Sequence, residues 1–213
     1  MLNLAPNELI CRIITLVIAL TLHEFAHAFT ADRFGDPSPR QAGQLTLNPL
    51  VHLDFLGSLM VLVTGYGWAK PTPINPAALR QHSKFAIIWV SIAGPLANLF
   101  LAVLAALPLR FGLVQVVSPT GFLPTLGEFL YIFFYINLIL AIFNLIPIPP
   151  LDGEKVLSAL LPENLESVYA KLRPYGPLLL IVLLLVGPQI HIDVIGWIMT
   201  PILTGLQKVL LGV

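Results

Sequence analysis

The chain has 213 residues, of which 57% are hydrophobic and only 10% are charged, and its formal net charge is zero. Soluble domains carry about 25% charged residues, so this composition excludes an ordinary water-soluble domain and indicates an integral membrane protein in a lipid bilayer. The neutral balance argues against a nucleic-acid partner, and the single cysteine, Cys11, excludes an internal disulfide and a cysteine-based zinc site.

Five apolar stretches are candidate transmembrane helices, since a span needs about 20 apolar residues. They lie at about 9–31, 85–108, 128–148, 175–190 and 194–211. The third is expected to continue to a Leu-Asp-Gly end at 152, and the last two are short enough to form a C-terminal hairpin over 175–211. The pattern predicts an all-α integral membrane protein with one membrane-embedded domain over 1–213 and a retained first helix.

Residues 41–79, between the first and second spans, have a different pattern. Residues 44–49 alternate in polarity before a proline, residues 53–63 are apolar but too short for a normal span, and glycines and prolines follow. We expect extended strands, a short helix and loops that enter the membrane and return. Irregular backbone at membrane depth is tolerated only where protein or a water-filled cavity satisfies it, so this re-entrant element could form the lip of an active site.

The first span contains His23-Glu24-Phe25-Ala26-His27, an H-E-x-x-H motif. Two histidines four residues apart share one helix face and can hold one metal ion, while the glutamate between them can take a proton from water at that ion. Ionisable groups inside hydrocarbon are costly and usually mark function. The motif therefore predicts a metal-dependent hydrolase that works within the bilayer.

A catalytic zinc ion usually has three protein ligands, and the best third candidate is Asp152. Pro147, Pro149 and Pro150 end or bend the preceding helix, which lets a short carboxylate turn inward. Gly153 then permits a tight turn and the close approach of another helix.

The basic residues of the loops predict the orientation. If residues 53–66 do not cross, Arg110 alone lies on one side, and the opposite, basic side is the cytoplasm by the positive-inside rule. The residues on that side are Arg33, Arg40, Lys70, Arg80, Lys84, Lys155, Lys171 and Arg173. The metal site is then near the cytoplasmic surface, the N-terminus is outside, and the C-terminus is cytoplasmic. If residues 53–66 crossed, Asp152 would lie at the opposite face from His23, too far for zinc bonds of about 2 Å.

Four motifs in order resemble the site-2 proteases, the intramembrane zinc metalloproteases of peptidase family M50. They are the H-E-x-x-H helix, LNPLVHLD at 47–54 with GWAKPTP at 67–73, AGPLAN at 93–98, and NLIPIPPLDG at 144–153. The resemblance covers about residues 15–160 and points to the short bacterial and archaeal branch, without PDZ or CBS domains. It implies one zinc ion held by His23, His27 and Asp152, Glu24 as the residue that activates water, and a prokaryotic inner or plasma membrane.

The expected reaction is hydrolysis of a peptide bond within or near a transmembrane segment of a membrane-protein substrate. Glu24 would take a proton from water and pass it to the leaving amine, and Asn144 or another polar group could donate to the oxyanion. The substrate helix has to unwind locally, because a helix engages its carbonyls in its own hydrogen bonds. Residues 43–48 could pair with the extended substrate as an added strand.

Three side chains are further candidates for binding substrate or the transition state. His52 could bind substrate, orient a ligand or act as a transient inhibitory ligand, or it could be a loop histidine beside Asp54. Asn144 could instead satisfy backbone groups that the prolines free. Asn98 is expected to bond between helices rather than to touch substrate. The Gly94-Pro95 pair predicts a kink with close helix packing.

Two other function classes stay open. One is a catalytically idle zinc-binding scaffold or chaperone, although a purely structural site has no need of the base that Glu24 supplies. The other is a metal transporter, which would more often show inverted repeats or a polar path through the membrane.

Overall fold

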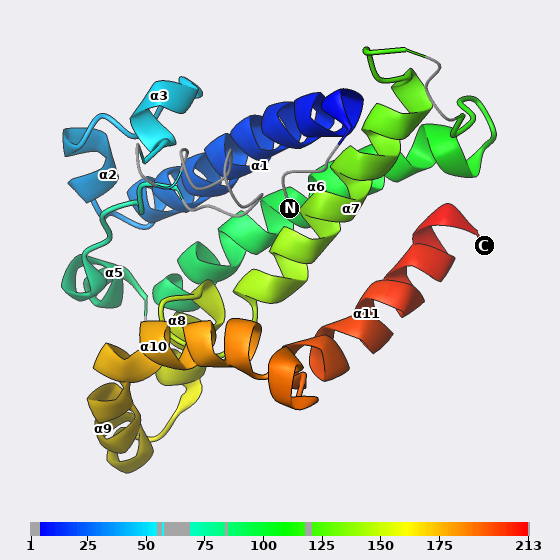
Figure 1. Ribbon diagram of the computed structural model, residues 1–213. Coiled ribbons are helices and arrows are strands. Elements are labelled where there is room, and N and C mark those ends of the chain that lie inside the picture. Colours follow the sequence, from blue (N-terminus) through cyan, green and yellow to red (C-terminus); the bar gives the residue numbers. More distant parts are fainter. Residues whose placement is uncertain (1–4, 55–56, 58–68, 84, 118–120, 213) are drawn as a thin grey trace.

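The computed structural model describes residues 5–54, 57, 69–83, 85–117 and 121–212, and helices form most of this part of the chain (Figure 1). In chain order they are α1 (Pro6–Arg33), α2 (Ser38–Gln41), α3 (Pro49–His52), α5 (Pro76–His82), α6 (Ala86–Arg110), α7 (Leu126–Asn144), α8 (Asp152–Leu160), α9 (Glu163–Leu172), the 3-10 turn η1 (Arg173–Tyr175), α10 (Gly176–Ile181), the π-helical turn η2 (Val182–Val186), the 3-10 turn η3 (Pro188–Ile190) and α11 (Val194–Leu211). The described residues contain no strand, and Leu53 and Ala69 form an isolated antiparallel bridge.

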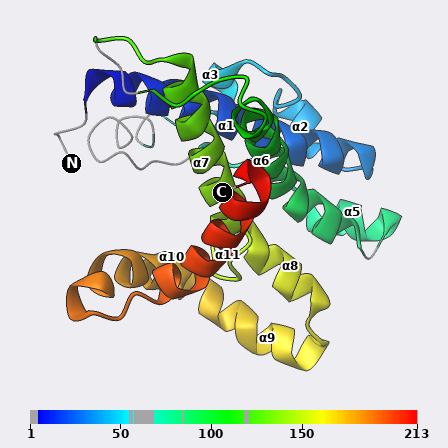
Figure 2. The same ribbon diagram turned by 90° about the vertical axis from the view of Figure 1, so that its right-hand side faces the viewer.

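Helices α1, α6 and α7 lie side by side and form the centre of the molecule (Figures 1 and 2). Five helices are long and apolar enough to cross a membrane, namely these three, the stretch Glu163–Val186, and α11. In the most apolar 18 residues of each helix, the buried share is 28% in α1, 33% in α6 and 39% in α7. It is 11% in Glu163–Val186 and 11% in α11. The first three helices therefore supply the core, where small residues such as Ala19, Ala28 and Ala102 let the backbones approach closely.

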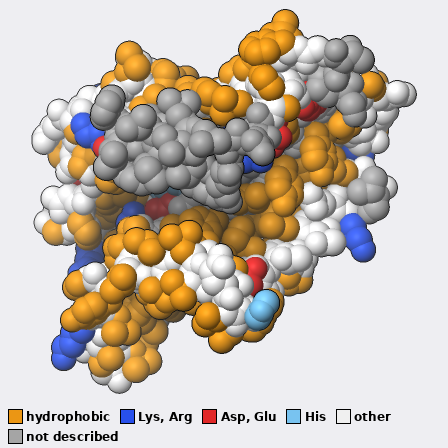
Figure 3. Space-filling view, in the orientation of Figure 1, with side chains coloured by type: hydrophobic (Ala, Val, Ile, Leu, Met, Phe, Trp, Pro, Cys, Tyr) orange, Lys and Arg blue, Asp and Glu red, His pale blue; other side chains and the backbone are white. Residues whose placement is uncertain are grey.

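The outward faces of these helices are hydrophobic. The face seen in Figure 3 is covered mainly by hydrophobic side chains, and its Lys and Arg side chains lie mostly toward the edges. Phe100 on α6 and Trp197 on α11, for example, are exposed by more than half. Soluble monomers rarely expose such extensive apolar surface, whereas lipid tails can cover it. The prediction of an all-α integral membrane protein is confirmed.

A sharp turn at the end of α1 leads away from the bundle. Gly35 has a φ of +81°, the left-handed conformation that commonly follows a helix. The buried Asp36 carboxylate then accepts hydrogen bonds from the backbone N–H groups of Ser38 (2.9 Å) and Asn75 (2.6 Å). This carboxylate joins the end of α1 to the loop that precedes α5.

Residues 43–48 do not form the expected strand. Gly43 has a φ of +70° and lies in a turn, and a bend at 45–46 follows it. The Asn48 side chain accepts a hydrogen bond from the Leu50 N–H at 3.1 Å, which caps the start of α3. The local turn and cap therefore override the alternating polarity that suggested extended backbone.

The two described ends of the predicted re-entrant segment lie next to each other. Leu53 pairs with Ala69, and the Lys70 N–H donates to the His52 carbonyl at 2.7 Å. The chain thus returns to the described structure at the place where it left, as a re-entrant element requires. The course of residues 55–56 and 58–68 lies outside the described residues.

The segment after α7 breaks earlier than the predicted 128–152 helix. Helix α7 ends at Asn144, residues 145–151 form turns and bends, and Asp152 is the first residue of α8. The prolines of this loop cannot continue the helix. A Cβ at Gly153 would lie 2.2 Å from the Leu145 carbonyl oxygen, so only glycine fits where the loop returns onto itself.

The C-terminal helices take a different course from the predicted hairpin at 175–211. The helical stretch already begins at Glu163, and it bends at η1, so α9 and α10 point in different directions (Figures 1 and 2). Helix α11 then packs along α6, and Arg110 at the end of α6 donates a hydrogen bond to the Val209 carbonyl. His27 contacts Val90 near the start of α6, so the C-terminus and His27 lie at opposite ends of the bundle.

This position corrects the predicted cytoplasmic C-terminus. In the predicted topology Arg110 is outside and the metal site is near the cytoplasm, so a C-terminus beside Arg110 is outside as well. The prediction fails because α10 and η2 are too short to cross the membrane, with six and five residues. At 1.5 Å per residue they span about 16 Å, roughly half of a hydrocarbon core about 30 Å thick. Together with α11 they cross the bundle once and not twice.

We expect a cysteine appended after Val213 and a cysteine replacing Lys171 to face opposite sides of the membrane. The appended cysteine should react with a membrane-impermeant thiol reagent in intact cells, and the K171C variant only after permeabilisation. The native Cys11 is buried, so the unmodified chain provides the background. Labelling of both cysteines in intact cells would contradict the arrangement.

Candidate metal centre

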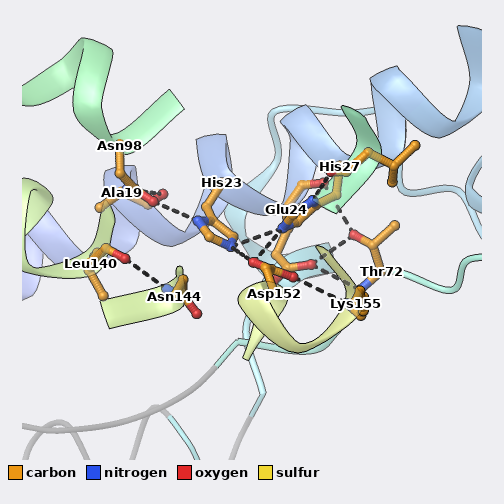
Figure 4. A network of polar contacts seen from close by, with 11 residues as sticks. Ala19, His23, Glu24, His27, Thr72, Asn98, Leu140, Asn144, Asp152 and Lys155 are labelled. Carbon is orange, nitrogen blue, oxygen red and sulfur yellow. Dashed lines mark hydrogen bonds and ion pairs between the residues drawn. The ribbon is translucent and has the colours of Figure 1, made fainter. Parts of the chain in front are cut away.

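Three buried side chains from distant parts of the chain point at one another. His23 and His27 come from α1, and Asp152 comes from the first turn of α8 (Figure 4). The Asp152 Oδ2 atom lies 3.1 Å from His23 Nε2 and 3.0 Å from His27 Nε2, and the two Nε2 atoms are 3.0 Å apart. Among the described residues, these form the one group that can hold a metal ion.

The other nitrogen of each ring fixes its protonation. His23 Nδ1 lies 2.6 Å from Asn98 Oδ1, and His27 Nδ1 lies 2.7 Å from the Val90 carbonyl oxygen. The Asn98 orientation follows from its Nδ2, which donates to the Ala19 carbonyl oxygen at 3.3 Å. Both partners of the histidines are acceptors, so both Nδ1 atoms carry the proton and both Nε2 atoms present a lone pair.

This donor set fits a metal ion. Two lone pairs and a carboxylate oxygen that converge at 3.0–3.1 Å repel one another unless a cation lies among them. In a tetrahedral site with bonds of about 2 Å, neighbouring ligand atoms are about 3.3 Å apart, close to the observed triangle. Two imidazoles and one carboxylate are also a ligand set that zinc accepts.

Gly94 on α6 forms the floor beneath the two rings. A Cβ at this position would lie 2.4 Å from His27 Nε2 and 2.6 Å from His23 Nε2. Any larger residue would therefore occupy the space at the ligand atoms. The close packing expected at Gly94-Pro95 is thus contact with the metal ligands themselves.

The second oxygen of Asp152 is held from outside the group. Lys155, one turn further along α8, lies with its Nζ 3.1 Å from Asp152 Oδ1. The Lys155 ammonium beside Oδ1 favours the charged form of this carboxylate. Asp152 is therefore ionised, as a metal ligand has to be.

Glu24 is fastened by a residue that sequence reasoning did not select. The Thr72 N–H donates to Glu24 Oε2 at 2.9 Å, and the Thr72 hydroxyl lies 2.8 Å from the same oxygen (Figure 4). Both contacts go to Oε2, so Oε1 accepts no hydrogen bond from the described part of the chain. Thr72 belongs to the GWAKPTP motif, which was the signal for its importance.

The other candidate residues lie outside the metal group. Asn98 is fully buried, and its Oδ1 contacts His23 Nδ1, which is a bond between helices as expected. A role of Asn98 toward a substrate stays a prediction. Asn144 donates to the Leu140 carbonyl oxygen at 3.0 Å, within its own helix. His52 is fully buried, and its Nε2 lies 2.7 Å from the Thr46 carbonyl oxygen. The roles of Asn144 and His52 toward a substrate stay predictions.

Comparison with known proteins identifies the family. Peptidase family M50 matches residues 110–186. The chain is 39% identical to the "Putative zinc metalloprotease YwhC" of Bacillus subtilis over 80% of this chain and 78% of that protein. The chain belongs to peptidase family M50. This M50 protein is also 34% identical to the "Putative zinc metalloprotease Rip2" of Mycobacterium tuberculosis, over 85% of this chain and 67% of that protein.

An archaeal relative shows the same likeness. The "Putative zinc metalloprotease MJ0611" of Methanocaldococcus jannaschii is 34% identical over 71% of this chain and 73% of its own length. No solved structure is significantly similar to the chain. The resemblance inferred from the four motifs is confirmed.

Gly94→Ala should lower the affinity for added Zn2+ by at least the roughly 10- to 100-fold that is typical of disturbed ligand surroundings, because the new Cβ collides with both ring nitrogens. Chelator competition on the purified protein measures this affinity. Gly205→Ala in α11 is the matched control, since its Cβ meets no atom within 4 Å. Wild-type affinity in the Gly94 variant would show that the rings do not hold the ion here.

Proposed function

We propose that this M50 protein is an intramembrane zinc metalloprotease that hydrolyses a peptide bond within or near a transmembrane segment of another membrane protein. The observation that carries the proposal is the meeting of His23, His27 and Asp152, with Glu24 adjacent in sequence and fastened on the same helix. The names of the M50 relatives support zinc as the metal.

A bound zinc ion would supply a Lewis acid that polarises the scissile carbonyl and makes a neighbouring water more acidic. His23, His27 and Asp152 would hold it. Asn98 and the Val90 carbonyl would fix the orientation of the two histidine rings.

Glu24 is the proton carrier in this proposal. Its Oε2 accepts both contacts from Thr72, so Oε1 is the atom that takes a proton from water and later delivers it to the leaving amine. Asn144 uses one N–H for the Leu140 carbonyl, which leaves a second N–H to donate to the developing oxyanion.

The position of the site along α1 suits cleavage inside the membrane near one surface. His27 precedes Arg33 by six residues, or about 9 Å at the helical rise of 1.5 Å per residue. With the basic loops in the cytoplasm, the site lies on the cytoplasmic side of a prokaryotic cell membrane. A substrate segment would have to unwind there to expose a carbonyl.

Two other functions predict different behaviour. A zinc-binding scaffold would keep its ion and cut nothing. A metal transporter would exchange ions readily through several sites. One tightly held zinc ion per chain, measured together with chelator-sensitive cleavage, supports the protease.

Glu24→Gln should abolish cleavage and leave one zinc ion bound, because the amide cannot accept a proton but none of the three ligands changes. Membrane proteins of cells that carry the variant or the wild type should be compared by length. Candidates that stay full-length only with the variant are then purified and incubated with zinc-loaded wild type, with and without a chelator. Cleavage by the Glu24→Gln protein would show that the base is misassigned.

Thr72→Val should lower kcat roughly ten- to a hundredfold with unchanged zinc content, since the hydroxyl contact to the charged Glu24 is worth about 1.5–3 kcal/mol. Thr72→Ser keeps the hydroxyl and should retain most of the activity. Cleavage rates and metal analysis on the substrates found above measure both effects. Equal kcat for the valine and serine variants would show that the hydroxyl does not hold Glu24.

A further inference from the structure

The three proposed ligands are supported from two different parts of the chain. The histidine rings are held by α6, through Asn98, the Val90 carbonyl and Gly94. Asp152 stands at the start of α8, and the residues around it contact the segment 163–176. We call this segment, which comprises α9, η1 and the first residue of α10, the C-terminal brace.

The centre of the brace is an ion pair on the first turn of α8. Arg173 Nε donates to Glu154 Oε1 at 2.6 Å, and Glu154 is only 8% exposed. The same guanidinium reaches further along α8 and α9, since its Nη2 donates to the Ser158 hydroxyl at 2.6 Å and to Glu166 Oε1 at 2.9 Å. One side chain therefore joins α8, α9 and η1.

Two more contacts tie the brace to the loop that precedes Asp152. The Tyr169 hydroxyl donates to the Pro147 carbonyl oxygen at 2.9 Å. A Cβ at Gly176 would lie 2.4 Å from the Pro149 Cβ and 2.5 Å from its carbonyl oxygen, so the two backbones are in direct contact. The brace thus contacts the chain both before and after Asp152.

We propose that Arg173 is a positioning residue for Asp152 and sets the affinity of the metal centre from outside it. Glu154 lies two residues after Asp152 on the same helical turn, so the orientation of this turn decides where Asp152 Oδ2 points. Without Arg173, a nearly buried carboxylate would lose its cation, and the turn would have to rotate to hydrate it. Asp152 would then move away from the two rings.

Arginine suits this role better than lysine. Its planar fork reaches Glu154, Ser158 and Glu166 together, whereas a lysine ammonium is a point charge on a flexible stem. The inference deepens the proposed function and rests on it for the identity of the metal. Its consequence is that the C-terminal helices, which supply none of the three gathered ligands, control how firmly the ion is held.

The test compares Arg173→Gln, Arg173→Lys, Glu154→Gln and the Arg173→Gln/Glu154→Gln double variant in the full-length protein. Lys171→Gln is the matched control, because Lys171 is exposed, lies two residues away and makes no ion pair within the described part of the chain. The dissociation constant for Zn2+ is measured by chelator competition, and the unfolding temperature of the metal-free protein is measured in parallel.

We expect Arg173→Gln to weaken Zn2+ binding by about 10- to 100-fold, the range found for groups that orient metal ligands. Arg173→Lys should fall between this variant and wild type, and Lys171→Gln should match wild type. The double variant should be no weaker than Arg173→Gln alone, because the two residues act as one unit. If Arg173→Gln does not fold, Arg173→Lys and Glu154→Gln still test the prediction.

Unchanged Zn2+ affinity in all Arg173 and Glu154 variants would overturn the proposal. So would a drop in metal-free stability with no change in affinity, which would mean that Arg173 only stabilises the fold. These measurements need no substrate. Weaker Zn2+ binding in the variants, together with a wild type that cuts nothing, would support the role of Arg173 and refute the protease. Unchanged Zn2+ binding in the variants, together with a wild type that cleaves its substrate, would refute the role of Arg173 and support the protease.

Discussion

The structure depends on satisfying polar groups inside an apolar bundle. His23 contacts Asn98 Oδ1, Asn98 Nδ2 donates to Asn137 Oδ1 at 3.0 Å, and Asn137 Nδ2 donates to the Phe133 carbonyl oxygen at 2.9 Å. This chain of bonds runs from α1 through α6 to α7, and both asparagines are fully buried. Because an unpaired polar group is costly in hydrocarbon, a slip of one helix would break several bonds at once. The network that orients the ligand therefore also sets the register of the three central helices.

The sequence predicted the parts of the site that have a chemical signature. Helix periodicity alone predicts that His23 and His27 share one face. The approach of Asp152 was predicted from the prolines before it and from the choice that residues 53–66 do not cross the membrane. Contributions made by backbone or by the absence of a side chain could not be predicted in the same way. The Val90 carbonyl has no residue type that marks it, and the role of Gly94 depends on which side of α6 faces the rings.

The fold prediction was wrong where the local sequence pattern and the tertiary structure favour different conformations. Alternating polarity from residue 44 to the proline at 49 suggested a strand near 43–48, but the turn at Gly43 and the Asn48 cap decide the backbone there. Hydropathy found the C-terminal apolar segments, yet hydropathy does not register that α10 bends away from α9 and is too short to cross alone. The end of the bundle at which the C-terminus lies depends on that bend. The hydrogen bond from Arg110 to the Val209 carbonyl shows that it is the end of α6 at Arg110.

The loop at 69–75, which carries Thr72, has a hydrogen-bond pattern that limits how a substrate could pair with it. The N–H groups of Lys70, Thr72 and Asn75 are bonded to the His52 carbonyl, the Glu24 carboxylate and the Asp36 carboxylate, and the prolines at 71 and 73 have none. An ordinary sheet edge alternates donors and acceptors. In this loop three of the five backbone N–H groups are bonded within the chain, and the two prolines supply none, so few donors are left for a neighbouring strand. The N–H groups of Thr72 and Asn75 bind Glu24 and the Asp36 carboxylate at the end of α1, so this loop holds the proposed base in place.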